Sequence, residues 1–298
     1  MENDFEEIKI TCPACGNVRT EFSFRKNGFD LYRCQICRHL FVYPIAYDAL
    51  ALYDADYFGG AKKGSGYVDY DADKEPMRST FLGYLREIEK FLPQKGELLD
   101  VGAATGFFMR IAEKSGWKAK GVEISEYAAE EARNRGLDVR CGTLNADGFA
   151  EGSFDVVTMW DVLEHVTDPE ADIRTVVRLL RPGGIVAINI PDSGSLYARI
   201  MGKEWHLLIP PEHLHLFSKR SVTALLKRSG FSVEKISKIG KSFTLEYIVQ
   251  TAAAWRKSGL LRRLAAFLKR HPMIGRLSIP INLRDNMFII ARKNDATA

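Results

Sequence analysis

The sequence predicts an α/β protein built on a doubly wound, mostly parallel sheet of seven strands, preceded by a small zinc ribbon. Two observations carry this prediction. Seven apolar, strand-like segments alternate with amphipathic helical segments across residues 77–298, which is typical of a parallel sheet with helices on both faces. Four cysteines form two C-x-x-C pairs within residues 1–43. A chain of 298 residues is long enough for both parts, and its 46% hydrophobic content excludes a disordered protein.

The N-terminal module is defined by Cys12-x-x-Cys15 and Cys34-x-x-Cys37, with 18 residues between the pairs. This spacing is typical of a tetrahedral zinc site in which each pair contributes two thiolates from one tight turn. Rubredoxin-like iron would use the same ligands, whereas redox-active pairs would need a βαβ context that is absent here. Asn27-Gly28 is a hairpin signal between two strand-like stretches. We therefore expect a zinc ribbon over residues 1–43 that depends on its metal for folding.

The charge of this module is balanced, with six Lys/Arg and six Asp/Glu in residues 1–43. A module that binds phosphate backbones should carry a visible excess of basic residues, so we do not expect nucleic acid as a partner. Residues 44–76 are rich in tyrosine and glycine. We expect them to form a lid or linker over the site described below, with an ordinary packing segment as the alternative.

Within residues 77–298, the apolar spacing gives the order of the elements. An amphipathic helix at residues 77–92 ends before Pro93. Strands are expected at residues 97–101, 118–123, 138–141, 154–160, 185–190, 231–239 and 287–292, and helices at residues 107–115, 126–135, 170–180 and 221–229. The Arg-Pro-Gly-Gly of residues 181–184 ends a helix sharply before a buried strand. The fifth cysteine, Cys141, closes the third strand, where we expect it to be buried.

The most informative segment is residues 98–108, Leu-Leu-Asp-Val-Gly-Ala-Ala-Thr-Gly-Phe-Phe. An apolar strand runs into a turn of small residues, and the turn opens a helix whose N–H groups favour a ligand. Gly102 and Gly106 let the backbone approach that ligand closely. Glu123 follows at the end of the next strand, about 20 residues on, where a carboxylate reaches a nucleotide ribose. Ala104 replaces the second glycine of the dinucleotide fingerprint, so a nucleoside without pyrophosphate fits better.

This turn resembles the first motif, D-x-G-x-x-x-G, of class I S-adenosylmethionine (SAM) dependent methyltransferases. Residues 154–166, 179–184 and 211–218 resemble later segments of the same family. Together the segments cover roughly residues 77–293 and resemble the subgroup that contains the ubiquinone-pathway O-methyltransferases. The resemblance implies a sheet that ends in an antiparallel pair of strands, and it implies SAM-dependent methyl transfer.

The resemblance also implies roles for individual residues. Those implied to hold SAM are Asp100, Gly102, Ala103 and Gly106 around the methionine part, Glu123 at the ribose, Ile124, Thr143 and Leu144 at the adenine, and Trp160 and Asp161 at the methyl-transfer site. The adenine edge is usually read just after the third strand, and this chain carries no acid there.

Three histidines lie in segments from which a base could reach a hydroxyl acceptor: His165, His213 and His215. Histidine suits proton removal at neutral pH, although each could equally be a structural residue of the core. Asp161, Glu164 and His165 would share one face of a helix by their spacing. With His213 or His215 they resemble the divalent-cation site of metal-assisted O-methyltransferases, with Asp161 in place of the first glutamate. Helix capping and core packing are the alternative.

A basic insertion is expected at residues 243–284, between the last two strands. From Tyr247 to Arg284 the chain has eight Lys/Arg and no Asp or Glu. Within residues 255–276, leucines and a phenylalanine form an apolar helical stripe flanked by basic residues. Such an element is typical of a helix that contacts a membrane surface or a partner. A cap over the substrate pocket is the alternative.

The leading hypothesis is a SAM-dependent methyltransferase that acts on oxygen of a small molecule, a sugar or a lipid-linked glycan. One alternative is an RNA methyltransferase that recognises its substrate through the zinc ribbon, and another is a non-catalytic SAM-binding regulator. The acidic N-terminus and the lack of an 18-residue apolar run predict a cytoplasmic protein, with peripheral contact to the inner membrane surface through residues 255–276. The sequence leaves the acceptor and the oligomeric state open.

Overall fold

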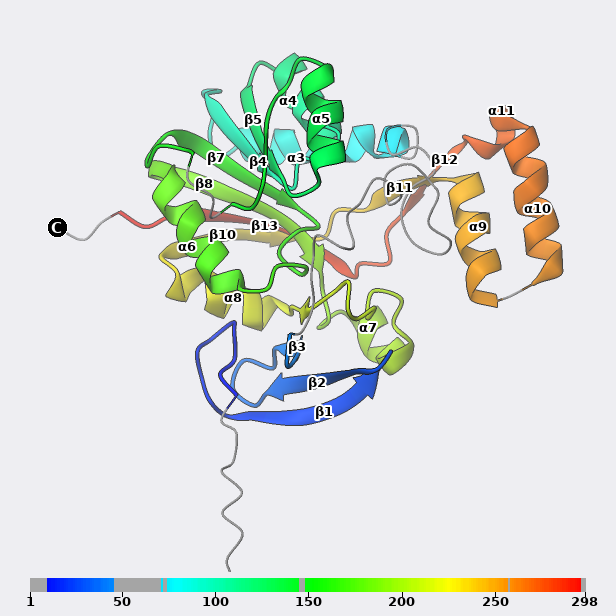
Figure 1. Cartoon of the computed structure of the whole chain (residues 1–298), viewed down its shortest axis with the longest axis horizontal. Helices are drawn as coiled ribbons and strands as arrows, with labels where there is room; N and C mark the ends of the chain where they lie inside the picture. The colour runs from blue at the N-terminus through cyan, green and yellow to red at the C-terminus, as the bar shows by residue number, and fades with distance from the viewer. Residues whose placement is uncertain (1–9, 46–70, 72–73, 145–147, 257, 296–298) are drawn as a thin grey trace, which may run out of the picture. The chain divides into compact units, whose positions relative to one another are not determined.

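A computed structural model describes residues 10–45, 71, 74–144, 148–256 and 258–295 (Figure 1). The chain divides into two compact units. One comprises residues 1–47, 147–237 and 284–298, and the other comprises residues 48–146 and 238–283. The predicted lid or linker at residues 44–76 lies largely outside the described residues.

The central sheet has seven strands in the order β10-β13-β8-β7-β4-β5-β6. β4 runs parallel to β5, β5 to β6, and β7 to β8, while β13 is antiparallel to both β8 and β10. This order confirms the predicted fold class, and the antiparallel pair confirms the expected end of the sheet.

The first unit begins with the small N-terminal sheet, which has the order β1-β2-β3-β9. Its strands are β1 (Thr20–Lys26), β2 (Phe29–Cys34), β3 (Leu40–Val42) and β9 (His215–Leu216). Asn27 and Gly28 form the two-residue turn between β1 and β2, with φ angles of 51° and 87°. Two positive φ angles are what a type I′ hairpin requires, which confirms the predicted hairpin. The fourth strand comes from far along the chain, because Phe41 pairs with His215.

The rest of the first unit carries one half of the large sheet. Its elements are β7 (Phe154–Trp160), α6 (Pro169–Leu179), β8 (Leu180–Pro191), α7 (Leu196–Met201), η2 (Gly202–Glu204), α8 (Lys219–Arg228), β10 (Phe231–Ser237) and β13 (Asn286–Lys293). The residues of β8 from Ile185 to Ile188 are fully buried, as the prediction of a buried strand requires. The helix expected to begin directly after β7 is wrong: Val162–His165 form a turn, and α6 begins only at Pro169. Asp168 caps that helix and Pro169 occupies its first position, which fixes the start there.

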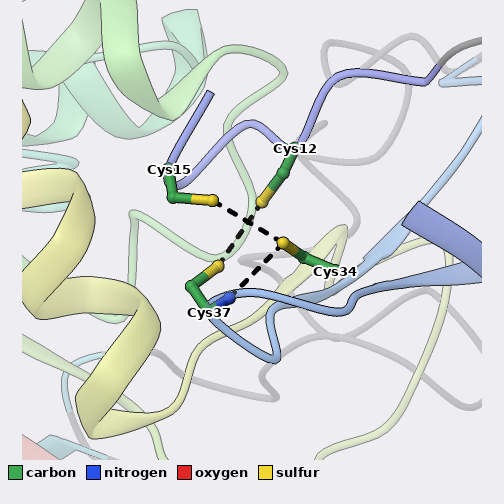
Figure 2. A group of neighbouring side chains, drawn as sticks. All are labelled: Cys12, Cys15, Cys34 and Cys37. Atoms are coloured by element: carbon green, nitrogen blue, oxygen red, sulfur yellow. Dashed lines mark hydrogen bonds between the residues drawn. The ribbon is translucent and has the colours of Figure 1, made fainter. Parts of the chain in front are cut away.

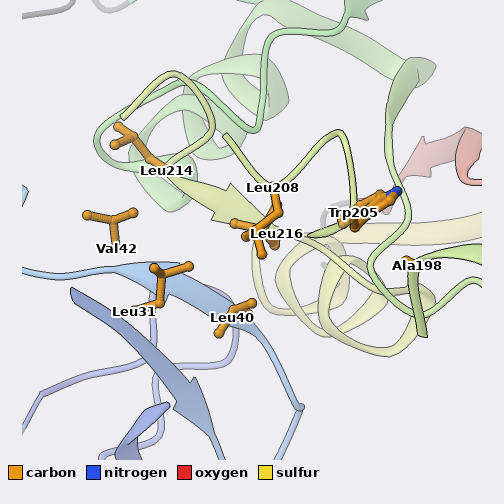
Figure 3. Packing of buried hydrophobic residues seen from close by; sticks show 8 residues of the cluster. All are labelled: Leu31, Leu40, Val42, Ala198, Trp205, Leu208, Leu214 and Leu216. Carbon is orange, nitrogen blue, oxygen red and sulfur yellow. The ribbon is translucent and has the colours of Figure 1, made fainter. Parts of the chain in front are cut away.

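A shared apolar core joins the N-terminal sheet to the elements that follow β8. Figure 3 shows its members: Leu31, Leu40, Val42, Ala198, Trp205, Leu208, Leu214 and Leu216. Full burial of one such Leu or Val side chain contributes about 1.5–3 kcal/mol. The N-terminal sheet is therefore attached to the rest of the first unit by packing as well as by the β3–β9 pairing.

The second unit carries the other strands of the large sheet. Its elements are η1 (Glu75–Met77), α3 (Arg78–Glu89), β4 (Glu97–Val101), α4 (Phe107–Lys114), β5 (Lys118–Glu123), α5 (Glu126–Asn134) and β6 (Asp138–Cys141). α3 buries Phe81, Tyr84, Leu85 and Ile88 on one side, as its amphipathic spacing predicts. Cys141 is exposed, so its predicted burial is wrong. β6 is the last strand of the sheet, and only one side of it is covered by a neighbouring strand.

The basic insertion consists of β11 (Lys241–Thr244), α9 (Leu245–Arg256), α10 (Gly259–Arg270), α11 (Pro272–Gly275) and β12 (Ser278–Ile281). β11 and β12 pair antiparallel, and α10 packs beside α9 (Figure 1). The predicted apolar stripe of α10 is divided: Leu268 is buried, whereas Leu260, Leu264 and Phe267 are exposed. Among the described residues, no helix is both long and apolar enough to cross a bilayer.

Candidate functional site

The loop after β4 is the segment that the sequence predicts to hold a nucleoside. Asp100 is buried at the end of the strand, and Gly102 is exposed with a φ of 72°. The N–H groups of Gly102 and Ala103 both donate to the carbonyl of Val122, at 2.9 and 3.1 Å, which ties the loop to β5. A left-handed, exposed glycine leaves the backbone open to a ligand where a Cβ would project. Gly102 therefore fits the predicted close approach.

Glu123 closes this loop from the end of β5. Its Oε2 accepts a hydrogen bond from the Ala104 N–H at 2.8 Å, and its Oε1 accepts one from the Ser125 N–H at 2.9 Å. The side chain is only 5% exposed, and this burial raises the pKa of Glu123, opposed by the backbone hydrogen bonds. Each carboxylate oxygen accepts about two hydrogen bonds. The backbone hydrogen bonds therefore leave acceptor capacity on the carboxylate, and its role at a ribose stays a prediction.

Gly106 is needed for packing, and its predicted part in binding SAM stays a prediction. It is buried with a φ of 77°, and a Cβ there would stand 2.0 Å from Leu137 Cδ1. Gly121, inside β5, plays a similar part and was not singled out from the sequence. A Cβ on it would meet Met109 Sδ at 2.7 Å and Ala103 Cβ at 2.8 Å. A glycine inside a strand is the signal that could have indicated this close approach.

The residues expected at the adenine lie at the ends of β5 and β6. Ile124 is half-buried directly after Glu123, Thr143 is exposed, and Leu144 is buried. Their order along the strand ends fits an adenine lying beyond the ribose site. Their roles stay predictions.

The end of β7 supplies the residues expected near the transferred methyl group. Trp160 is half-buried and stacks on Phe288, with ring centroids 6.0 Å apart. Asp161 has a φ of 56°. Its N–H donates to the carbonyl of Asn189 at 2.8 Å, and its Oδ1 accepts from the Asn189 amide at 2.6 Å. Asp161 is thereby held at the carboxyl end of the sheet.

Glu164, His165 and His213 come together, with their ligand-type atoms all within 4.8 Å of one another. His165 Nδ1 lies 2.6 Å from the Glu212 carbonyl, and His213 Nδ1 lies 2.6 Å from the Leu207 carbonyl. Because a carbonyl only accepts, each Nδ1 carries the proton and each Nε2 carries the lone pair. Backbone carbonyls that fix the tautomer in this way are typical behind metal-ligating histidines.

Asp161 stands outside this group, which corrects the predicted cation set of Asp161, Glu164 and His165. The three residues do not share a helix face, because residues 162–165 form a turn, and the Asp161 carboxylate accepts from Asn189 instead. Burial lowers the pKa of His165, although the Glu212 carbonyl opposes that effect. Neutral His165 therefore keeps its Nε2 lone pair.

His215 occupies a different position. It is fully buried in β9, and its Nδ1 lies 3.3 Å from Nε2 of His39, with the two rings stacked 5.5 Å apart. Burial lowers the pKa of His215 to about 4. This position fits the structural role that was the alternative to a catalytic base. It places His215 where β9 pairs with β3.

The four cysteines converge at the tip of the N-terminal sheet (Figure 2). Cys12 Sγ lies 3.6 Å from Cys37 Sγ, and Cys15 Sγ lies 3.6 Å from Cys34 Sγ. All four are free cysteines, and tetrahedral Zn–S bonds of about 2.3 Å place sulfurs about 3.8 Å apart. The Cys37 N–H points at Cys34 Sγ at 3.4 Å. The sulfur set thus has the size of a closed four-thiolate site.

The pKa values of three of these cysteines are shifted by burial and by hydrogen bonds within the cluster. Burial raises the pKa of Cys15 to about 11, and a hydrogen bond with Cys12, together with burial, raises the pKa of Cys37 strongly. Burial raises the pKa of Cys34, but hydrogen bonds from the N–H groups of Cys37 and Ile36 lower it. The net effect is a lowered pKa. Metal binding here would release protons from the buried thiols.

A seven-stranded sheet with a reversed strand, a glycine loop and a buried acid at the next strand end defines the class I, SAM-dependent methyltransferases. The family model described as "Methyltransferase domain" matches residues 76–236, and the chain belongs to this family. It is a SAM-dependent methyltransferase whose N-terminal cysteine cluster is consistent with a zinc ribbon.

Named relatives support this assignment. A ubiquinone biosynthesis O-methyltransferase of Methylococcus capsulatus is 35% identical over 130 residues, which cover 40% of this chain and 54% of that protein. The matched region thus spans about half the length of that relative. A protein of the same name in Pseudomonas aeruginosa is 30% identical over 180 residues, which cover 52% of this chain and 77% of that protein.

Solved structures show the same fold at lower identity. The PH0226 protein of Pyrococcus horikoshii superposes with a TM-score of 0.51 at 19% identity, over 75% of this chain and 94% of that one. The YcgJ protein of Bacillus subtilis gives a TM-score of 0.51 at 15% identity, over 73% of this chain and 100% of that one.

Proposed function

We propose that this methyltransferase acts on a hydroxyl oxygen of a small molecule, a sugar or a lipid-linked glycan. The observation that carries the proposal is the meeting of Glu164, His165 and His213, which sets two Nε2 lone pairs beside a carboxylate. The relatives named as ubiquinone biosynthesis O-methyltransferases support an oxygen acceptor.

The residues of the second unit fit SAM. Glu123 would accept from the ribose hydroxyls, Gly102 and Ala103 would face the methionine part, and Ile124 with Leu144 would pack on the adenine. When bound, SAM supplies a methyl group that is already activated on a sulfonium. The protein therefore contributes mainly alignment of donor and acceptor, which can lower a barrier by about 7–11 kcal/mol.

The residues of the first unit would act on the acceptor. Trp160 and Asp161 would line its path, and the Nε2 lone pair of His165 or His213 would take the proton of the attacking hydroxyl. Positioned proton removal of this kind contributes about 10²–10⁴-fold in rate. Glu164, buried beside both rings, would stabilise the positive charge that the proton brings.

The same three side chains fit a divalent cation. Two histidine nitrogens and a carboxylate are a common ligand set, and bond lengths of about 2.1 Å place ligand atoms at most about 4.2 Å apart. His165 Nε2 lies 3.9 Å from Glu164 Oε1, so closure around a cation needs only small side-chain movements. A cation there would favour the ionised form of a nearby hydroxyl.

The four cysteines would hold structural zinc. The sulfur spacing and the N–H to sulfur contact of Cys37 support this, and four thiolates leave no open coordination position for chemistry. The exposed Leu260, Leu264 and Phe267 of α10, flanked by basic residues, support contact with an anionic membrane surface that would present a lipid-linked acceptor.

The deciding experiment incubates the protein with methyl-labelled SAM and separate pools of quinone precursors, glycans, lipids and RNA. A low-molecular-weight or glycan product in which NMR assigns the labelled carbon to a methyl ether supports an ether-forming O-methyltransferase. Label in RNA would support the RNA methyltransferase alternative. SAM binding by calorimetry with no labelled product in any pool would favour the non-catalytic regulator.

Two variants connect the activity to the site. His213→Ala and Glu164→Gln should lose methyl transfer while SAM binding is kept, because neither residue belongs to the proposed cofactor cradle. Added Mg²⁺ or Zn²⁺ after chelation separates a cation site from a simple base.

For the membrane contact, sedimentation with anionic liposomes compares the wild type with a variant in which α10 residues 262, 263, 269 and 270 are changed to Glu. Equal sedimentation of both would refute the membrane contact.

A further inference from the structure

A groove of about 1150 Å³ lies in the first unit, between the N-terminal sheet and the elements that follow β8. One wall comes from β2, β3 and the second cysteine knuckle, and the other comes from α7, η2 and the start of α8. Its floor is the segment Asp192–Gly194, directly after β8. The volume is that of a small-molecule site.

The groove is strongly basic. Six cationic side chains and a single acid line it, the cations being Arg33, Arg38, Arg199, Lys203, Lys219 and Arg220. Within the described part of the chain, none of the six forms an ion pair, although many other surface arginines of this protein do. The acid, Asp192, is 6% exposed, and its Oδ1 accepts from the Gly194 N–H at 2.9 Å. Apart from the attraction between Arg33 and its cross-strand neighbour Glu21, no charge interaction balances the cations of the walls among the described residues.

Two of the cations are placed by the cysteine centre. Arg33 directly precedes Cys34, and Arg38 directly follows Cys37 with a φ of 64°. Arg33 and Arg38 both line the groove. Two guanidinium groups that line the same groove can bind a multiply charged anion.

The opposite wall repeats the pattern at α8. Lys219 and Arg220 occupy the first turn of this helix, which contains no acid. Cations at the positive end of a helix dipole are unfavourable by themselves, and a bound anion would relieve both the helix end and the side chains. Lys219 and Arg220 therefore place positive charge at a helix end where it does not stabilise the helix.

Apolar residues complete the lining: Phe24, Leu40, Ala198, Trp205 and Leu208. Lys203 Nζ lies 4.9 Å from the centre of the Phe24 ring, so a cation of η2 contacts an aromatic ring of β1. Leu40, Ala198, Trp205 and Leu208 are already buried in the shared core, so the half-buried Phe24 is the main apolar surface that a ligand in the groove could contact. A phosphate joined to an organic group would contact the Phe24 ring as well as the cationic side chains.

We propose that this groove binds a phosphate- or diphosphate-bearing small molecule, with the phosphates between the ribbon arginines and the start of α8. The ribbon would then contribute to ligand binding as well as to stability, because its cysteine centre positions Arg33 and Arg38. The assignment is independent of the methyl acceptor, since binding can be measured without SAM or turnover. Failure of one proposal therefore leaves the other standing.

The test uses the zinc-loaded chain of 298 residues in low-salt calorimetry with four probes: inorganic pyrophosphate, uridine diphosphate, farnesyl diphosphate and single-stranded RNA. We expect one diphosphate per chain, with an organic diphosphate binding more tightly than pyrophosphate. Tighter uridine diphosphate indicates a nucleotide, and tighter farnesyl diphosphate indicates a lipid carrier. No binding of any diphosphate at millimolar concentration would overturn the proposal.

The variant Lys219→Glu/Arg220→Glu should weaken pyrophosphate and uridine diphosphate binding by tenfold or more, about the worth of one charge-assisted hydrogen bond. Acids in a first turn favour the helix, so the fold should be kept, which thermal unfolding verifies. Arg262→Glu/Arg263→Glu near the start of α10 makes the same charge change elsewhere and should leave both affinities unchanged. Equal binding by the groove variant refutes the site, as does RNA binding that exceeds that of all diphosphates and is lost in this variant.

Discussion

Replacing Glu123 by Gln tests the cofactor cradle most directly. The carboxylate accepts one backbone N–H on each oxygen, from Ala104 and from Ser125. A carboxamide keeps one acceptor and turns the other into a donor, so one buried N–H loses its partner, at a cost of about 1–3 kcal/mol. Burial raises the pKa of Glu123, so the neutral amide recovers part of the cost of burying the charge. We expect a net loss of about 1 kcal/mol in the free energy of unfolding.

The loss of SAM affinity should be larger. Charge-assisted bonds from two ribose hydroxyls are each worth about 1.5–3 kcal/mol, and Gln retains at most one neutral acceptor. A loss of about 2–4 kcal/mol corresponds to a dissociation constant raised roughly 30- to 1000-fold. Isothermal titration with SAM and with its demethylated product measures this change.

Glu126→Gln is the matched control, because Glu126 is exposed three residues further on and pairs with Arg133 at 2.7 Å. Its loss should cost less than about 1 kcal/mol of stability and leave the SAM affinity unchanged. If Glu123→Gln bound SAM as tightly as the wild type, the ribose assignment and the reasoning from its two acceptor positions would be refuted.

Four further outcomes follow from the structure. His213→Ala should lower the turnover by about 10²-fold or more at unchanged SAM affinity; a loss of SAM binding instead would contradict the acceptor-side placement. Removing zinc with a chelator under reducing conditions should lower the unfolding temperature by several degrees, and re-addition should restore it, whereas no change would argue against a structural metal. The stabilisation that SAM gives in thermal unfolding should shrink as the pH falls through the raised pKa of Glu123, because SAM binds the ionised form. Without SAM, the contribution of Glu123 to stability has the opposite pH dependence. A carboxyl whose pKa is raised on folding stabilises the fold below its unfolded pKa and loses that contribution as the pH rises. Leu31→Ala, at a fully buried position, should cost about 2–5 kcal/mol, while Leu260→Ala, at a position 77% exposed, should cost less than about 0.5 kcal/mol in denaturant unfolding.

The elements of the methyltransferase domain could be predicted from sequence because local signals agree with the tertiary structure. β4, β5, β6 and β7 begin and end at the predicted residues, since each is a short segment with alternating or continuous apolar residues that is bounded by turn residues. The cysteine centre and the Asn27-Gly28 hairpin were predictable for the same reason. Glu123 was predictable from its offset behind the glycine turn.

Features that depend on distant pairing were beyond reach. Nothing near His215 indicates that it pairs with Phe41 of the ribbon, and a two-residue strand leaves no periodic pattern. Glu164 and His165 were correctly linked with His213, but by a helix that does not form. The cap at Asp168 and the proline after it outweighed the i, i+4 spacing. Cys141 was misplaced because apolar character does not tell an edge strand from a central one.

The pairing of β3 with β9 has a consequence for dissection of the protein. A chain shortened to begin beyond residue 43 would leave Leu208, Leu214 and Leu216 without their cover and Leu216 without its hydrogen-bonded neighbour. An uncovered apolar surface next to an open strand edge promotes self-association. Such a truncated enzyme should aggregate on expression, and its loss of activity would then reveal nothing about whether the ribbon takes part in catalysis.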